Sequence, residues 1–134
     1  MTELNEKYPL QETRTVADKT IELRFHLYVQ YGSADRNEQG ERLEGVVDRE
    51  GAFHDVPWRA DKWQEVCPGV LVRTDGSEAH FGGGRGSQTK ETFVKIERSA
   101  CPVRLLAKHV TDYSSEDYYK GDSRPYAIQL VAAD

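Results

Sequence analysis

Hydrophobic and polar residues alternate most clearly over residues 21–31. Apolar side chains occupy every odd position of this stretch, and polar or amphipathic ones occupy the even positions: Ile21, Leu23, Phe25, Leu27, Val29 and Tyr31 against Glu22, Arg24, His26, Tyr28 and Gln30. Successive side chains of a strand point to opposite faces, so a period of two predicts a long strand with one buried and one solvated face. Burial on one face is typical of antiparallel sheets.

Turn signals separate shorter apolar runs. Residues 43–47 and 52–56 flank Asp48-Arg49-Glu50-Gly51, which predicts a hairpin. A second hairpin is expected from residues 70–73 and 78–81, with Asp75-Gly76 inside the turn 74–77, because Asp-Gly favours the positive φ of tight hairpin turns.

Three more runs, 92–97, 102–110 and 126–130, bring the expectation to about seven or eight strands. The predicted fold is mainly β, an antiparallel β-sandwich or partly closed barrel. Two short helices are compatible with the pattern. One covers residues 55–66, with Asp55 as N-cap, and one is a single turn over residues 115–121 that ends at Gly121.

The first 18 residues show no sustained period and contain Pro9, so we expect residues 1–18 to form a flexible or loosely docked N-terminal arm. Residues 19–134 then form a single β domain, which agrees with the 134-residue length of the chain. No run of 18 apolar residues occurs, so no membrane span is expected.

Charge and cysteine content narrow the setting. The net charge is -5, and residues 1–67 carry the whole acidic excess, with 9 Lys+Arg against 14 Asp+Glu. An acidic chain makes nucleic acid an improbable partner, since phosphate binding needs a basic footprint. The N-terminus shows no signal segment, which predicts a soluble cytoplasmic protein, or a secreted one whose leader has been removed. Cys67 and Cys101 are compatible with two free thiols or one disulfide.

Two loops carry weak signals for ligands. The glycine-rich stretch 82–90 could hold an anion near Arg85, but it lacks the spacing of either nucleotide-binding glycine motif and also fits a plain hairpin loop. Residues 112–122 gather carboxylates and hydroxyls that could bind calcium, yet Asp117 and Ser123 stand where the calcium loop needs Gly and Glu. We therefore predict no cofactor and no metal, and the calcium alternative for residues 112–122 stays open.

Aromatic residues supply the candidate binding site. Rigid rings with a polar tip are favoured on recognition surfaces, and they cluster around residues 113–126. The predicted ligand-binding residues are Arg85, Tyr113, Tyr118, Tyr119, Trp58 and Trp63. Some of these rings could instead cover the ends of the core. The four histidines, His26, His54, His80 and His109, have no zinc-like spacing, and His109 stands three residues before Asp112.

The sequence leaves three classes of function open. The first is a non-catalytic recognition module that binds a glycan, a small molecule or a protein through aromatic end loops. The second is a small hydrolase or nuclease that uses a histidine with Arg85 or a carboxylate, or a cysteine nucleophile. The third is an acidic inhibitor or immunity-type protein that binds a basic partner. No recognised family and no oligomeric state follow from the pattern.

Overall fold

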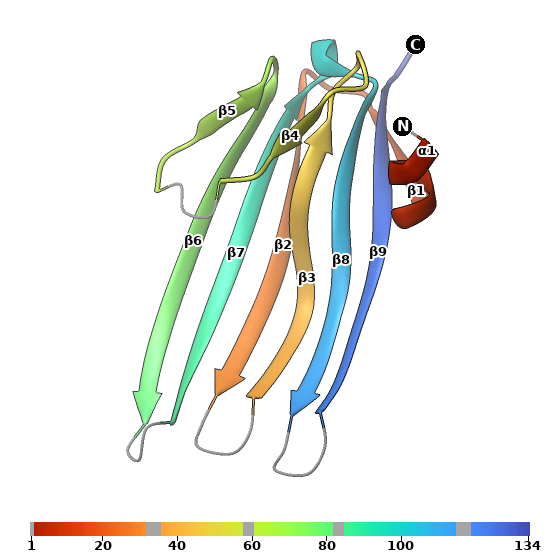
Figure 1. Ribbon diagram of the computed structural model, residues 1–134. Coiled ribbons are helices and arrows are strands. Elements are labelled where there is room, and N and C mark those ends of the chain that lie inside the picture. The colour runs from red at the N-terminus through yellow and green to blue at the C-terminus, as the bar shows by residue number, and fades with distance from the viewer. Residues whose placement is uncertain (1, 32–35, 58–60, 82–84, 115–118) are drawn as a thin grey trace.

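The computed structural model describes residues 2–31, 36–57, 61–81, 85–114 and 119–134, and all structural statements below concern these residues. Strands dominate them (Figure 1). The elements are α1 (Thr2–Lys7), β1 (Leu10–Val16), β2 (Thr20–Tyr31), β3 (Arg36–Val47), β4 (Phe53–Asp55), β5 (Gln64–Cys67), β6 (Val70–Phe81), β7 (Arg85–Glu97), the 3₁₀ turn η1 (Arg98–Ala100), β8 (Val103–Ser114) and β9 (Tyr119–Ala132).

All nine strands belong to one hydrogen-bonded sheet. Its order is β1-β9-β8-β3-β2-β7-β6-β5, and β4 pairs with β3 outside this path. The pairs are antiparallel except β1 with β9, which is parallel. The expectation of a mainly β fold with few helices is confirmed, as is the long strand over residues 21–31.

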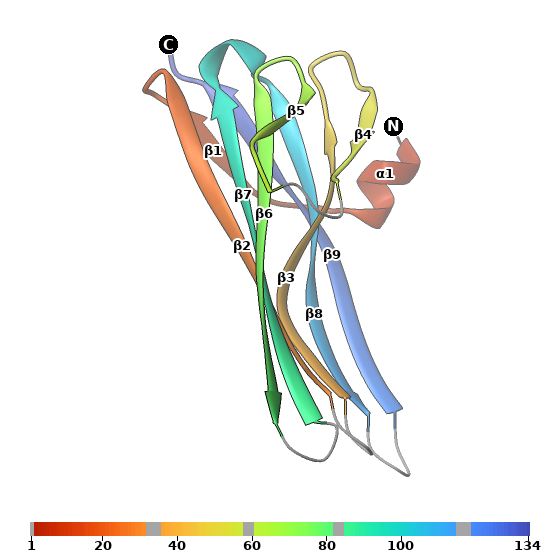
Figure 2. The same ribbon diagram turned by 90° about the vertical axis from the view of Figure 1, so that its left-hand side faces the viewer.

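The junction between β2 and β3 divides the sheet into two groups of strands. These strands pair only where residues 27–31 meet residues 36–40, although β2 pairs with β7 and β3 pairs with β8 along almost their whole lengths. Beyond this junction the strands separate into β2-β7-β6-β5 and β3-β8-β9-β1 with β4. The ribbons lie close together at the hairpin end and spread apart toward the end that carries α1 (Figure 2).

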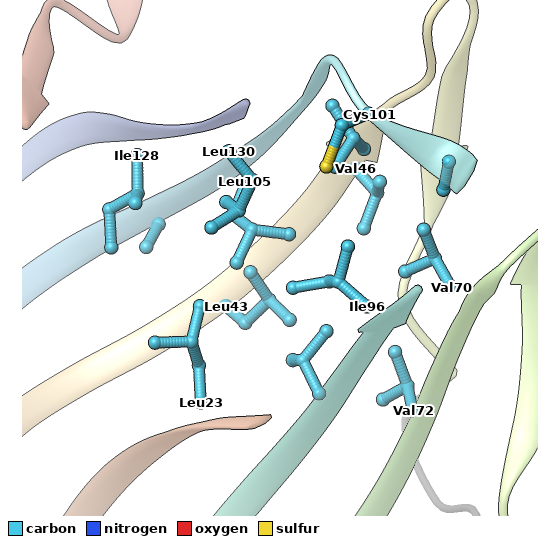
Figure 3. Packing of buried hydrophobic residues seen from close by; sticks show 14 of the residues in the cluster. Leu23, Leu43, Val46, Val70, Val72, Ile96, Cys101, Leu105, Ile128 and Leu130 are labelled. Carbon is cyan, nitrogen blue, oxygen red and sulfur yellow. The ribbon is translucent and has the colours of Figure 1, made fainter. Parts of the chain in front are cut away.

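The main core lies between the two groups where they separate. One side of it comes from β2, β6 and β7, and the other from β3, β8 and β9, with side chains that point toward one another (Figure 3). Its fully buried members include Val70, Val72, Ile96, Leu105 and Leu130. The molecule is therefore layered like a sandwich at one end and continues as a single sheet at the other.

Gly40 stands at the point where the two groups meet. It opposes Leu27 on β2 and Val110 on β8, and its φ is 127°, a conformation that residues with a side chain rarely adopt. A Cβ at this position would overlap the backbone carbonyl oxygen of His26. The glycine therefore allows β3 to approach β2 closely before the two strands diverge.

The expectation of a flexible arm over residues 1–18 requires correction. Residues 10–16 form β1, whose partners run from Ala127 to Ala132 on β9, and Val16 is buried in the main core. Tyr8, with Leu4 beside it, packs in a second apolar cluster with Val47, Leu106 and Ala127, so α1 lies against β8 and β9 (Figure 1). Within the described residues, no helix is long and apolar enough to cross a membrane.

Of the local expectations, one is confirmed and three change. The hairpin at residues 48–51 is confirmed, because β3 pairs with β4 and Asp48 accepts hydrogen bonds from the backbone amides of Glu50 and Ala52. The turn at residues 74–77 is wrong, since β6 runs through it in unbroken register with β7. Residues 55–66 hold the end of β4 and the start of β5 instead of a helix, with residues 58–60 outside the described part. Of the helical turn over 115–121, residues 119–121 belong to β9 and residues 115–118 are not described.

Candidate functional site

The predicted recognition residues that the structure describes lie on different parts of the sheet. Tyr113 and Tyr119 lie at the end of the β8–β9 hairpin, where Tyr113 opposes Lys120 and Tyr119 opposes Ser114. Arg85 begins β7 opposite Phe81, at the same end of the sheet (Figure 1). Trp63 immediately precedes β5, which pairs with the start of β6, so it lies toward the end of the sheet opposite the hairpins. Trp58 and Tyr118 lie outside the described residues.

Trp63 is held between cations on the outer face of β6 and β7. The Lys95 ammonium lies 5.0 Å and the Arg73 guanidinium 5.8 Å from the centre of the Trp63 ring, and Arg73 also lies 4.7 Å from the centre of the Phe93 ring. These are cation–π distances. Trp63 and both cations are only partly exposed, so the cluster packs against the outer face of the sheet and not against the main core.

A cleft lies on the other group of strands, beside the start of β1. Its volume is about 660 Å³, and it is open to solvent. Pro9, Leu10 and Gln11 form one wall, and the others come from β3, β8 and β9: Gln39, Gly40, Glu41, His109, Val110, Thr111, Arg124, Pro125 and Tyr126. The Pro9 carbonyl accepts a hydrogen bond from Ala127, and a register shift between Leu10 and Glu12 marks a bulge at Gln11. The chain is thereby fixed against the sheet where it lines the cleft.

His109, Tyr126 and Glu41 form the polar centre of this cleft. The rings of His109 and Tyr126 stack with their centres 4.2 Å apart and their planes 18° from parallel. The Tyr126 hydroxyl donates a hydrogen bond to the Glu41 carboxylate, and a ring nitrogen of His109 lies 3.1 Å from Oε1 of Gln11. Each polar side chain is thus held in place by a neighbour from another strand.

The environment of Tyr126 keeps its hydroxyl protonated. Burial raises the pKa of Tyr126 well above its ordinary value, and the hydrogen bond and negative charge of Glu41 raise it further. Nearby, Arg14 bonds to Glu12 through Nε at 3.0 Å and Nη2 at 3.1 Å. The carboxylate of Glu12 raises the pKa of Arg14, with a smaller effect in the same direction from Glu41. The cleft therefore presents fixed hydrogen-bond donors and acceptors at neutral pH.

Sequence reasoning found only part of this cleft. In the sequence, Tyr126 is the last ring of the aromatic cluster at 113–126, and His109 stands near Asp112 and far from Gln11. Tyr126 and Glu41 are 85 positions apart, and His109 and Gln11 are 98 apart, so no local motif joins them. The available signal was weak: His109 and Tyr126 are aromatic residues near the ends of two runs, 102–110 and 126–130, that the pattern predicts as strands.

The thiols fit a structural role. Cys67 and Cys101 are both free and buried in the main core. Burial raises the pKa of Cys67 to about 11, with smaller contributions from Asp48 and Glu65, and burial also raises the pKa of Cys101. A nucleophilic cysteine needs the opposite shift. Within the described residues, no three His, Cys, Asp or Glu side chains gather in a metal-binding arrangement.

Comparisons with known proteins found only weak structural similarity. No family model matches the chain, and no curated protein matches it. Among solved structures, a family 123 glycoside hydrolase from Clostridium perfringens, described in terms of glycolipid glycan hydrolysis, aligns with 92% of this chain at 9% identity and a TM-score of 0.37. The alignment spans 23% of the hydrolase chain. Neither fold nor function follows from a likeness of this size.

Proposed function

We propose that this chain is a non-catalytic recognition module that binds a small polar ligand, such as one sugar unit of a glycan, in the cleft beside β1. The observation that carries the proposal is the cleft itself, in which His109, Tyr126, Glu41 and Gln11 converge from four strands. Its volume of about 660 Å³ lies within the range of small-ligand sites.

The lining suits a ligand with many hydroxyl groups. Carboxylate and amide oxygens from Glu41, Gln11 and Gln39 can accept hydrogen bonds, and the His109 ring offers a flat surface for the apolar face of a sugar ring. Leu10, half exposed at 49%, extends the apolar part of the wall. A mixture of apolar surface and a few oriented polar groups is what small-ligand sites provide.

Fixed side chains support binding in a further way. The Tyr126–Glu41 hydrogen bond and the His109–Tyr126 stack hold the polar groups before a ligand arrives. Side chains already held in one rotamer lose less entropy on binding, which improves affinity. Recognition by the cleft would therefore not need the aromatic residues at the hairpin ends.

Ligand-observed NMR with a panel of mono- and disaccharides tests the proposal. We expect saturation transfer to at least one sugar, and His109→Ala should weaken its binding about five- to thirtyfold, since losing a ring contact and a hydrogen bond costs about 1–2 kcal/mol. Glu41→Gln should also weaken binding, because it removes the charged acceptor.

His26→Ala is the matched control. His26 is an exposed histidine on β2, and its side chain lies 3.3 Å from a carboxylate oxygen of Glu91, on the face of the strand opposite the buried Phe25 and Leu27. It should leave both the saturation transfer and the fold unchanged. If no saccharide binds, or if His26→Ala and His109→Ala weaken binding equally, the cleft is not the recognition site.

A further inference from the structure

Gln11 is the extra residue of a bulge in β1. The register with β9 shifts between Leu10 and Glu12, so two steps along β1 match one step along its partner strand. Bulges of this kind change the direction of a side chain and often lie beside functional sites. Strand β9 separates β1 from β8, yet Oε1 of Gln11 lies 3.1 Å from Nε2 of His109 on β8. The Gln11 side chain therefore reaches past one strand to contact a residue of the cleft.

The contact between Gln11 and His109 fixes the direction of a hydrogen bond. An amide oxygen only accepts hydrogen bonds, so Nε2 of the His109 ring is the donor. A neutral imidazole carries one ring hydrogen, and its other nitrogen keeps a lone pair that accepts. With the hydrogen on Nε2, Nδ1 of His109 is an acceptor.

The Nδ1 atom is the polar part of the His109 ring that remains for a ligand. Tyr126 stacks against the ring at 4.2 Å, and Gln11 bonds to Nε2. Within the part of the chain that the structure describes, Nδ1 has no hydrogen-bond partner. His109 is only partly exposed and lines the cleft, so a ligand that fills the cleft would replace solvent at this atom.

We propose that Gln11 is a positioning residue for ligand binding. It holds the neutral His109 ring with its hydrogen on Nε2, so that Nδ1 accepts a hydrogen bond from a hydroxyl group of the ligand. The choice of a hydroxyl group rests on the proposed function of the cleft, whereas the position of the ring hydrogen does not.

The groups beside His109 favour the same class of ligand. Glu41 opposes His109 on β3, and its carboxylate, which accepts the Tyr126 hydroxyl, can only accept further hydrogen bonds. An ionised carboxylate or phosphate of a ligand also only accepts, so it would leave Nδ1 without a donor and lie near a negative charge. Arg124 lines the cleft as well, but its side chain is exposed and already interacts with another group. The cleft therefore suits neutral sugar rings better than acidic or phosphorylated ones.

NMR of the ¹⁵N-labelled chain without ligand tests the position of the ring hydrogen. At about pH 9 the neutral form of a histidine dominates. Long-range ¹H–¹⁵N correlations should then show the His109 hydrogen on Nε2 alone in the wild type. Gln11→Leu removes the acceptor, so the hydrogen should be shared between the two nitrogens and their ¹⁵N shifts should move toward each other. Gln11→Glu keeps an accepting oxygen and should restore the wild-type pattern.

Thr13→Leu is the matched control for Gln11→Leu. It introduces the same apolar side chain at another exposed position of β1 and should leave the His109 shifts unchanged. A wild-type ring with its hydrogen on Nδ1 would overturn the proposal. So would a Gln11→Leu variant whose His109 shifts equal those of the wild type, because the ring would then keep its hydrogen without help from Gln11.

Fluorinated sugars test the hydroxyl contact. The probes are the methyl glycosides of glucose, galactose and mannose with their monodeoxyfluoro analogues, in which fluorine takes the place of one hydroxyl and cannot donate. For a parent glycoside that binds, one analogue should bind about tenfold more weakly, since an acceptor left without its donor costs that much. This ratio should fall to about one in His109→Ala and persist in His26→Ala, because only the first variant removes the acceptor.

The outcomes separate the two proposals. If no glycoside binds, the proposed function fails and the hydroxyl contact fails with it, whereas the ligand-free spectra still decide the role of Gln11. If a glycoside binds but no analogue is weakened, or if the tenfold ratio persists in His109→Ala, the cleft binds sugars without a hydroxyl contact to His109.

Discussion

Individual residues decide where this sheet bends and where its turns close. Gly40 allows the close approach of β3 to β2, and Asp48 organises the β3–β4 hairpin through two backbone amides and His54. Both effects depend on one side chain, or on its absence, and can be tested by single substitutions.

Replacing Gly40 should destabilise the fold strongly. Gly40→Ala would place a Cβ against the His26 carbonyl oxygen in a backbone conformation with φ of 127°, and we expect a loss of about 2 kcal/mol or more in the free energy of unfolding. Gly76→Ala is the control, because its Cβ would meet the carbonyl oxygen of Thr89 at an ordinary 3.4 Å. Urea denaturation measures both. Equal losses would show that the backbone at Gly40 is not strained by a side chain.

Asp48 should make stability depend on pH in the acidic range. Its hydrogen bond with His54, 2.7 Å from Nε2 to Oδ2, is the largest cause that holds the pKa of Asp48 below 3.8, followed by the amide of Ala52. A depressed pKa in the folded state contributes stability above the unfolded pKa, and this is lost as pH falls through the folded value. The stability difference between the wild type and Asp48→Asn should therefore shrink as the pH falls below 3.8. Thermal melts from pH 2 to 7 measure it, and His54→Ala should weaken the dependence.

At the scale of elements, the sequence predicts strands best where one face is buried along the whole strand. The alternation over residues 21–31 correctly predicts β2, because the alternate residues Leu23, Phe25 and Leu27 are all buried. The turn at Asp75-Gly76 fails because twelve cross-strand pairs with β7 outweigh a two-residue preference. The hydrophobic pattern does not predict β1, because Val16 is the only one of its seven residues that is buried.

The same limit applies to the cleft. Each of its walls comes from a different part of the chain, and the contacts that define it join positions 85 and 98 apart. Strand pairing brings them together, and the pairing of β1 with β9 crosses nearly the full length of the sequence. Local patterns predict the strands, but they do not indicate which strands become neighbours.

A substitution in β1 tests whether this segment is an integral strand. Val16 is 1% exposed in the main core, so Val16→Ala should lower the free energy of unfolding by about 2 kcal/mol, from lost burial and the cavity left behind. Thr15→Ala, at the exposed neighbouring position, should change it by less than about 0.5 kcal/mol. Chemical denaturation distinguishes them. A Val16→Ala variant as stable as the wild type would return residues 10–16 to the status of an arm.

At the scale of the whole molecule, the two strand groups share one core, although they hydrogen-bond to each other at a single junction. Side chains of β2, β6 and β7 meet those of β3, β8 and β9 in one continuous cluster (Figure 3). The β2–β3 ladder joins the groups by backbone pairing only over residues 27–31 and 36–40. We therefore expect the shared apolar cluster to make the two groups fold as one cooperative unit.

Native-state hydrogen exchange measures this cooperativity directly. The slowest amides of β7, around Val94 and Ile96, should exchange with the same opening free energy as those of β8, around Leu105 and Ala107. Leu105 is fully buried, and Leu105→Ala should cost about 2–5 kcal/mol. Because the core is common, the slow amides of β7 should lose as much protection as those of β8. Loss confined to β8 and its neighbours would mean that the two groups open separately, and that the layered end behaves as two independent sheets.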